Sequence, residues 1–211
     1  MSESSNILSI HSIVEGRLYL RVRPCGGCGD GPLVADDGNM SHDAEGGVLA
    51  VPVTCRACGG ADEVRFDTGG LELPESVISR WFKEGFDAVI NPTDEASRVI
   101  DVADWLTLYS VMETDAQAVT DRKEARKFHI AAARCIDEAL KFFDLDNDLP
   151  PADAFFGESS RRQFRDRPEI FTRQHLVDLR NKLPVKRVGE GGTGSEGGLG
   201  KPKKRRWLPW G

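Results

Sequence analysis

Four cysteines stand in two Cys-x-x-Cys pairs, Cys25 with Cys28 and Cys55 with Cys58. A structural zinc ion takes four sulfur or nitrogen ligands in a tetrahedron, and two such turns supply two thiolates each. In a reducing compartment this pattern favours metal binding over disulfide formation. The sequence therefore predicts a structural Zn²⁺ site that protein ligands fill completely, with no open position for water or a substrate.

A glycine follows each pair, Gly29 after the first and Gly59 after the second. Glycine suits a metal knuckle, where the backbone turns with positive φ and amides point at the thiolates. An offset of thirty residues aligns Cys25 with Cys55 and superposes an apolar run, a knuckle, a turn and a return strand in both copies. Two interpretations stay open: a two-fold pseudo-repeat, or two unrelated hairpins that share only the knuckle.

Other chemistries of paired cysteines fit less well. One alternative is that the four cysteines are simply buried apolar residues. Such residues would have no reason to occur in two Cys-x-x-Cys pairs. A thioredoxin-like redox pair needs a Cys-x-x-Cys at the start of a helix, and neither pair has that context. Iron is the remaining alternative, since rubredoxin also uses two such knuckles. However, rubredoxin packs an aromatic core around its iron, whereas residues 16–70 contain only Tyr19 and Phe66 as aromatic residues.

The two Cys-x-x-Cys-Gly knuckles resemble those of the zinc-ribbon family, over residues 16–70. The resemblance implies β-hairpins held by a structural metal, and it implies no particular activity. Zinc ribbons occur in transcription and translation factors, as stabilising appendages of enzymes, and in protein-binding modules. The later stretches NPTDEASRVIDVADWLTL and ALKFFDLDNDLPPADAFF resemble bacterial proteins that couple a zinc ribbon to a helical region.

Short strands are predicted around the cysteines. Leu18, Leu20 and Val22 alternate with polar or aromatic residues and predict a strand that leads to the first pair. A second apolar run, 48–53, leads to the second pair, and 33–35 and 63–66 are the predicted return strands.

Helices are predicted after residue 70, from apolar residues spaced three and four apart. Thr120 is the predicted N-cap of the third helix. The second and third helices are separated by about seven residues, so an antiparallel helical hairpin is expected. The predicted ranges are 74–86, 94–113, 121–143 and 168–183. The predicted fold class is α+β: a small antiparallel β zinc ribbon, an α-helical region with a helical hairpin and additional helices, and a disordered C-terminal tail.

Composition divides the 211 residues further. Residues 1–90 carry 7 Lys and Arg against 14 Asp and Glu, so the cysteines lie in the acidic part of a chain whose net charge is −6. The segment 189–200 has seven glycines in twelve residues, which predicts a flexible linker. The predicted organisation is a flexible N-terminus (1–15), a zinc-ribbon β domain (16–70), an α-helical domain (71–188), the Gly-rich linker (189–200) and a basic tail (201–211).

The tail combines positive charge with tryptophan, a combination that suits an acidic protein, a nucleic acid or an anionic surface. A solubilising tail, or one that folds back on the acidic half of the chain, stays an alternative. The predicted partner-binding residues are Lys201, Lys203, Lys204, Arg205, Arg206, Trp207 and Trp210.

Three features that suggest additional sites have simpler interpretations. The run DLDND resembles the start of an EF-hand loop, but a leucine stands where glycine is required and a phenylalanine where the final glutamate is required, which indicates a solvated acidic turn. Cys135 falls on an apolar helix stripe and is predicted to be buried. His42 has no ligand-like spacing to the cysteines and is predicted to be an exposed loop residue.

No nucleophile, phosphate-loop or dinucleotide motif is present, so no enzymatic activity is predicted. The sequence shows neither a secretory signal nor a transmembrane segment, and a cytoplasmic location is expected. The predicted function is a non-enzymatic zinc-binding adaptor whose helical region and tail contact a macromolecule, a protein being favoured. The alternatives are a nucleic-acid-binding ribbon protein of transcription or translation and, below that, rubredoxin-like electron transfer.

Overall fold

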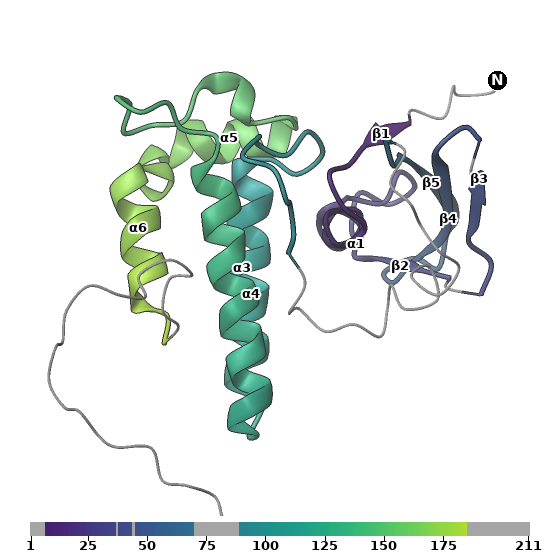
Figure 1. Cartoon of the computed structure of the whole chain (residues 1–211), viewed down its shortest axis with the longest axis horizontal. Helices are drawn as coiled ribbons and strands as arrows, with labels where there is room; N and C mark the ends of the chain where they lie inside the picture. Colours follow the sequence, from purple (N-terminus) through teal and green to yellow (C-terminus); the bar gives the residue numbers. More distant parts are fainter. Residues whose placement is uncertain (1–6, 37, 44, 70–88, 185–211) are drawn as a thin grey trace, which may run out of the picture.

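The structure, a computed structural model, describes residues 7–36, 38–43, 45–69 and 89–184. Described residues up to 69 form a β-sheet with one helix, here called the sheet region, and residues 89–184 form the helical region (Figure 1). The α+β class is therefore confirmed.

The sheet is built around its longest strand, β4 (Val48–Cys55). Strand β5 (Ala61–Asp67) pairs antiparallel with one side of β4, while β3 (Ser41–Asp43) and then β2 (Leu33–Ala35) pair antiparallel with the other side. Strand β1 (Leu8–Ser9) extends the sheet by pairing with β5 in parallel. The predicted strands at 33–35, 48–53 and 63–66 are confirmed, but the sheet is mixed where a purely antiparallel ribbon was expected.

The predicted strand before the first cysteine pair is wrong: these residues belong to helix α1 (Ile13–Val22). The hydroxyl of Ser12 caps the helix by accepting a hydrogen bond from the backbone N–H of Glu15, at 3.1 Å. The Ser-x-x-Glu spacing is the sequence signal for this cap. Leu18 and Leu20 are both buried although they do not share a helical face, because α1 packs against the sheet on one side and against the helical region on the other.

Helix α1 covers one face of the sheet, and every second residue of β4 points to this face. Leu49, Val51 and Val53 are buried on this face, and Cys55 continues the same alternation. Gly16 permits a close approach between α1 and Ile10, since a Cβ there would lie 3.2 Å from the terminal methyl group of Ile10. Tyr19 meets Phe66 edge to face with ring centroids 6.0 Å apart. This small core supports one end of the cysteine cluster.

Residues 1–15 were expected to form a flexible N-terminus, and the structure describes this segment from residue 7 onward. Their described part contains β1 and the first turn of α1, held by the parallel pairing to β5 and by the Ser12 cap. The hydroxyl of Ser12 also donates to the backbone carbonyl of Ile90, which ties the start of α1 to the helical region. The predicted domain boundaries near residues 70 and 188 lie outside the described residues and stay predictions.

The helix predicted from residue 94 begins later, as α3 (Val102–Ala118). Before it, side chains close local turns: Asn91 Oδ1 accepts from the N–H of Thr93, and Ser97 Oγ accepts from the N–H groups of Val99 and Ile100. Such side-chain-to-backbone bonds compete with helix formation. Asp101 then caps α3 by accepting from the N–H of Asp104 at 2.9 Å.

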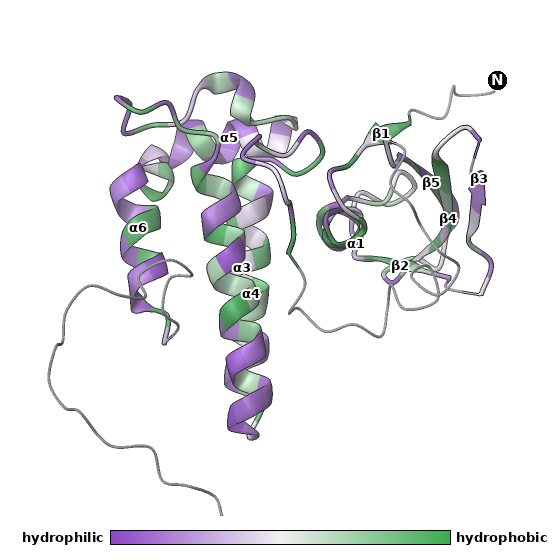
Figure 2. Cartoon of the chain, in the orientation of Figure 1, coloured by the Kyte–Doolittle hydropathy of each residue, from purple (hydrophilic) through white to green (hydrophobic). Residues whose placement is uncertain are grey.

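Helix α4 (Arg122–Leu140) confirms the helix predicted over 121–143, although Asp121 and not Thr120 is its N-cap. Helices α3 and α4 pack side by side as the expected hairpin (Figure 1). Trp105, Leu108 and Met112 of α3 are fully buried, as are Cys135 and Ile136 of α4. The end of the hairpin where α3 leads into α4 is hydrophilic (Figure 2), so the core lies in the half nearer the other helices.

Two further helices complete the helical region. Helix α5 (Glu158–Asp166) has no counterpart among the predicted helices, and α6 (Arg173–Lys182) occupies the second part of the range predicted as 168–183. A 3-10 turn, η2 (Pro168–Phe171), replaces the first part. The ring of Phe155 stacks on that of Phe164 with centroids 4.4 Å apart and meets that of Phe171 edge to face with centroids 5.2 Å apart. These contacts join the elements into one aromatic core.

Among the described residues, no helix has both the length and the apolar composition of a membrane span.

Candidate metal centre

The register of two strands brings the cysteine pairs together. The first pair lies between the end of α1 and β2, whereas the second begins at the last residue of β4. Because β2 pairs with β4 so that Leu33 lies opposite Cys55, the loop before β2 is folded onto the turn after β4. The backbone N–H of Arg56 donates to the carbonyl of Pro32 at 3.0 Å and joins the two loops.

The two knuckles share one backbone conformation. The N–H of Gly29 donates to the carbonyl of Cys25 at 2.8 Å, and the N–H of Gly59 donates to the carbonyl of Cys55 at 2.9 Å. Both glycines have positive φ, +78° and +73°. The thirty-residue offset therefore holds for the knuckles and return strands. It fails for the elements that precede them, which are a helix before the first knuckle and a strand before the second.

The four cysteine sulfurs form one compact cluster, in which all Sγ atoms lie within 4.8 Å of one another. The Sγ atoms of Cys25 and Cys58 are 3.8 Å apart, and those of Cys28 and Cys55 are 3.7 Å apart. These separations exceed the roughly 2 Å of a disulfide bond. They match the edge of about 3.8 Å that a tetrahedron has when each sulfur lies about 2.3 Å from a central zinc ion.

Backbone N–H groups point at two of the four sulfurs. The N–H of Gly27 points at Cys25 Sγ and that of Gly60 at Cys58 Sγ, each at 3.4 Å. Hydrogen bonds from the backbone N–H groups of Cys28 and Gly27 lower the pKa of Cys25 to about 7, whereas burial and the hydrogen bonds among the cysteine thiols raise the pKa of Cys28 to about 12. An N–H donor stabilises the charged form of a thiol, and the thiolate is the form that binds metal.

The residues present fit a thiolate-bound metal ion with a closed coordination shell. Cys25 and Cys55 are buried while Cys28 and Cys58 are exposed, so the cluster lies at the surface with one side against the small core. Four sulfurs complete a tetrahedron and leave no position for a further ligand. Ferric iron suits the same donor set.

The cluster is connected to the helical region through α1. Arg21 lies in the last turn of α1, four residues before Cys25. Its guanidinium contacts two residues of α3: one nitrogen lies 3.9 Å from a carboxylate oxygen of Asp115, and another donates to Met112 Sδ at 4.0 Å. At the other end of α1, His11 Nε2 lies 3.6 Å from a carboxylate oxygen of Glu95. The knuckle that follows α1 is thus one end of a helix that packs against both regions.

Other residues singled out in the sequence do not join the cluster. Cys135 is fully buried in α4, and burial, with the nearby charge of Glu138, raises its pKa, as expected for a packing residue. The run 144–148 forms exposed turns after α4, which confirms the acidic turn. His42 was expected in an exposed loop. It instead lies half-buried in β3, opposite Leu49, because this short strand pairs with β4.

Several predicted elements lie outside the described residues: the helix at 74–86, the linker at 189–200, and the tail residues from Lys201 to Trp210. Sequence reasoning also missed features that the fold assembles from distant segments. Asp101 is one, since its second carboxylate oxygen accepts from the N–H of Phe156 at 2.9 Å. The sequence signal for this role is an aspartate directly before an apolar run, which is typical of a helix N-cap.

The chain was compared with protein-family models and with curated proteins, and its structure with solved structures, and none of the three comparisons gave a match.

Proposed function

We propose that the protein is a non-enzymatic adaptor in which Cys25, Cys28, Cys55 and Cys58 hold one structural zinc ion. The observation that carries the proposal is the four-sulfur cluster, in which two separations of 3.7 and 3.8 Å match the edge of a zinc tetrahedron and four donors leave no open position. A closed site supplies folding free energy and no reactive water, and such sites contribute on the order of 10 to 16 kcal/mol.

The sheet region is where this free energy is needed. Its core is small, and two of its strands have only three residues each. The zinc ion would fix the loop after α1 to the turn after β4, and through α1 it would fix the surface that α1 offers to α3. The helical region would then contact a macromolecular partner, together with the tail 201–211.

Metal analysis of the natively purified protein tests the zinc site. We expect one zinc per chain and no visible absorption, because zinc thiolates are colourless. A red protein with iron in place of zinc would overturn the structural zinc site in favour of electron transfer. Removal of the metal by a chelator is expected to unfold the sheet region and to leave the α3–α4 hairpin helical in circular dichroism.

Cross-linking of the full chain to bound macromolecules tests the adaptor role. The matched comparison is a variant in which the five tail cations are replaced by glutamine. A specific protein that binds the parent chain with a reproducible stoichiometry supports the role. Substrate turnover that one substitution in the helical region abolishes would contradict it.

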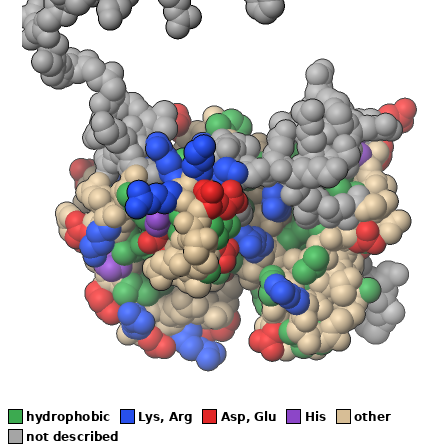
Figure 3. Space-filling view, turned by 90° about the horizontal axis from the view of Figure 1, so that it is seen from below, with side chains coloured by type: hydrophobic (Ala, Val, Ile, Leu, Met, Phe, Trp, Pro, Cys, Tyr) green, Lys and Arg blue, Asp and Glu red, His purple; other side chains and the backbone are tan. Residues whose placement is uncertain are grey.

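A second candidate, nucleic-acid binding, is favoured by one observation. The first two turns of α4 carry Arg122, Lys123, Arg126 and Lys127 at the hydrophilic end of the hairpin, where Lys and Arg side chains gather (Figure 3). Contacts to phosphate make affinity fall steeply with salt. A salt-dependent affinity that Arg122→Glu with Lys123→Glu abolishes would support this function, and no binding at low salt would exclude it.

A further inference from the structure

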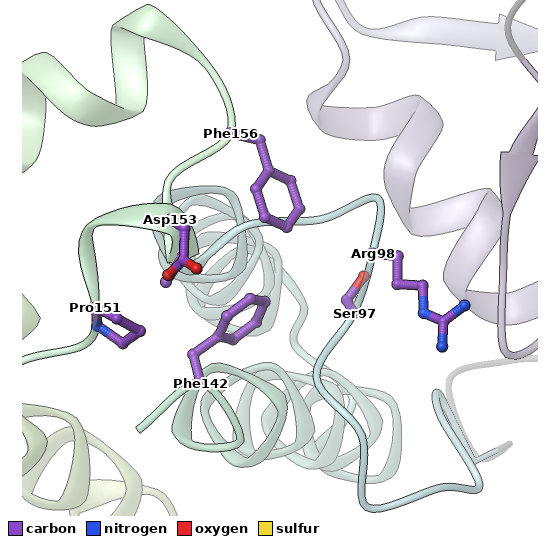
Figure 4. Close-up of a pocket in the computed structure, with 7 residues that line it drawn as sticks. Ser97, Arg98, Phe142, Pro151, Asp153 and Phe156 are labelled. Atoms are coloured by element: carbon purple, nitrogen blue, oxygen red, sulfur yellow. The ribbon is translucent and has the colours of Figure 1, made fainter. Parts of the chain in front are cut away.

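A cavity of about 400 Å³ opens in the helical region, between the end of α4, the loop that follows it, and the segment before α3. Phe142, Pro151, Ala154 and Phe156 give it an apolar lining, and Asp153 lies at its edge (Figure 4). The rings of Phe142 and Phe156 are tilted with centroids 6.2 Å apart. Two phenyl rings beside a carboxylate suit an aromatic ring or an organic cation.

The loop that lines this cavity exposes further apolar side chains. Leu145 is 96 % exposed and Phe156 is 39 % exposed. An exposed apolar side chain that lines a concave site, as Phe156 does, is typical of a binding surface. The structure therefore offers a groove for an apolar ligand at this end of the helical region.

The same loop is acidic. Asp144, Asp146, Asp148 and Asp153 are exposed, and none of them forms an ion pair within the described part of the chain. The cationic residue of the cavity, Arg98, is bonded to Glu95 at 3.0 Å. A ligand that combines apolar rings with several positive charges would complement this surface.

The chain itself contains such a ligand. The segment KPKKRRWLPWG, residues 201–211, has five cationic residues and two tryptophans. We infer that residues 201–211 dock on this surface of the same chain, with a tryptophan ring in the cavity against the rings of Phe142 and Phe156 and with basic side chains against Asp146 and Asp153. Offset or edge-to-face aromatic contacts hold the ring, and the carboxylates attract the cations.

The length of the intervening chain permits this contact. Sixteen residues separate Pro184, the last described residue, from Lys201, and such a segment can span roughly 55 Å. Helix α4, the longest element of the helical region, is only about 28 Å long. A tethered ligand has an effective concentration in the millimolar range, so individually weak contacts suffice. Docking would keep the tail from external partners until one of them competes for it, which goes beyond the adaptor role and does not depend on the metal.

Fluorine NMR of the full, zinc-loaded chain carrying fluorotryptophan tests this inference. The signals of Trp207 and Trp210 are assigned with Trp207→Phe and Trp210→Phe, and a peptide of residues 201–211 gives the shifts of the undocked tail. We expect at least one tail signal to differ from the peptide. It should return to the peptide position in Asp146→Asn with Asp153→Asn, and in Phe156→Ala.

A charge-matched control is Glu45→Gln with Asp166→Asn, which removes two exposed acidic groups elsewhere and should leave the tail signals unchanged. Because Phe156→Ala changes packing, the aspartate pair is the decisive variant. The side chains of Asp146 and Asp153 make no hydrogen bond within the described part of the chain, so their replacement is not expected to disturb the fold.

Three results would overturn the inference. Tail signals that coincide with the peptide in the parent chain would show an undocked tail. A difference that disappears on dilution, together with dimers in sedimentation, would place the tail on a second copy. If the tail signals still differ from the peptide in the Asp146→Asn, Asp153→Asn variant but match it in the control variant, the tail lies on another acidic surface.

Discussion

The Sγ atoms of Cys28 and Cys55 lie 3.7 Å apart although 26 residues separate them in the chain. This contact exists because Leu33 pairs with Cys55 across two antiparallel strands, which folds the loop of the first cysteine pair onto the turn of the second. The assembly of the cysteine cluster therefore depends on the pairing of β2 with β4.

Replacement of Cys28 by serine is expected to remove the metal. Cys28 is exposed, so the substitution opens no internal cavity and acts through the lost thiolate. Loss of a residue that only hydrogen-bonds to a metal ligand lowers metal affinity by roughly 10- to 100-fold. Cys28→Ser removes a ligand itself, so we expect zinc affinity to fall by more than this. Competition with a chromogenic chelator measures this loss. Cys135→Ala is the matched control: it removes the buried fifth cysteine, and retained zinc stoichiometry is expected there.

Gly59→Ala should weaken the second knuckle without any steric clash. Gly59 has φ of +73°, and an added Cβ would meet no atom within 4 Å, so the cost arises from the backbone alone. We expect a loss of about 1 kcal/mol in the free energy of unfolding, measured by urea denaturation of the zinc-loaded protein. Gly26→Ala, in the first knuckle, is equally open and lacks positive φ. Equal losses in the two variants would refute the backbone explanation.

Adjacent phenylalanines should respond differently to truncation. Phe155 is buried against Phe164 and Phe171, and Phe155→Ala is expected to cost about 3 to 5 kcal/mol of unfolding free energy. Phe156 is partly exposed at the cavity, so Phe156→Ala should cost much less. Thermal unfolding monitored by circular dichroism compares the two. Similar losses would show that the Phe156 side chain also belongs to the core.

Stability should depend on pH through Asp104. Burial, and then the nearby charge of Asp101, raises the pKa of Asp104 to about 7, whereas an unfolded aspartate has a pKa of about 3.9. The folded chain therefore holds this proton after the unfolded chain has lost it. The stabilising contribution of the group is complete below about pH 4 and is lost as pH rises towards 7.

Asp104→Asn should consequently stabilise the protein above pH 7 and have little effect near pH 4. We expect a gain of about 1 to 2 kcal/mol, because the N-terminal dipole of α3 offsets part of the burial cost. Urea denaturation across this pH range measures the gain. Asp94→Asn, at an exposed position before α3, is the control. A gain independent of pH would show that the substitution acts through packing.

Local sequence patterns predicted several features because short-range physics decides them. The cysteine spacing and the glycines after each pair determine the knuckles, since ligand turns need thiols at fixed separation and positive φ. The apolar stripe with Cys135 and Ile136 predicted α4, because one continuous face of this helix packs on α3.

The tertiary structure decided what depends on distant contacts. Alternation at Leu18 and Leu20 predicted a strand, yet both are buried in a helix that lies between a sheet and a second helix. The cavity at Phe142 and Phe156 arises where residues 97–98 meet residues 142–156. The sequence by itself determined the chemistry of the four clustered thiols, because thiol identity and loop spacing are local. Only the register of β2 against β4 decided that the four sulfurs meet, because strand pairing is a long-range contact that periodicity does not encode.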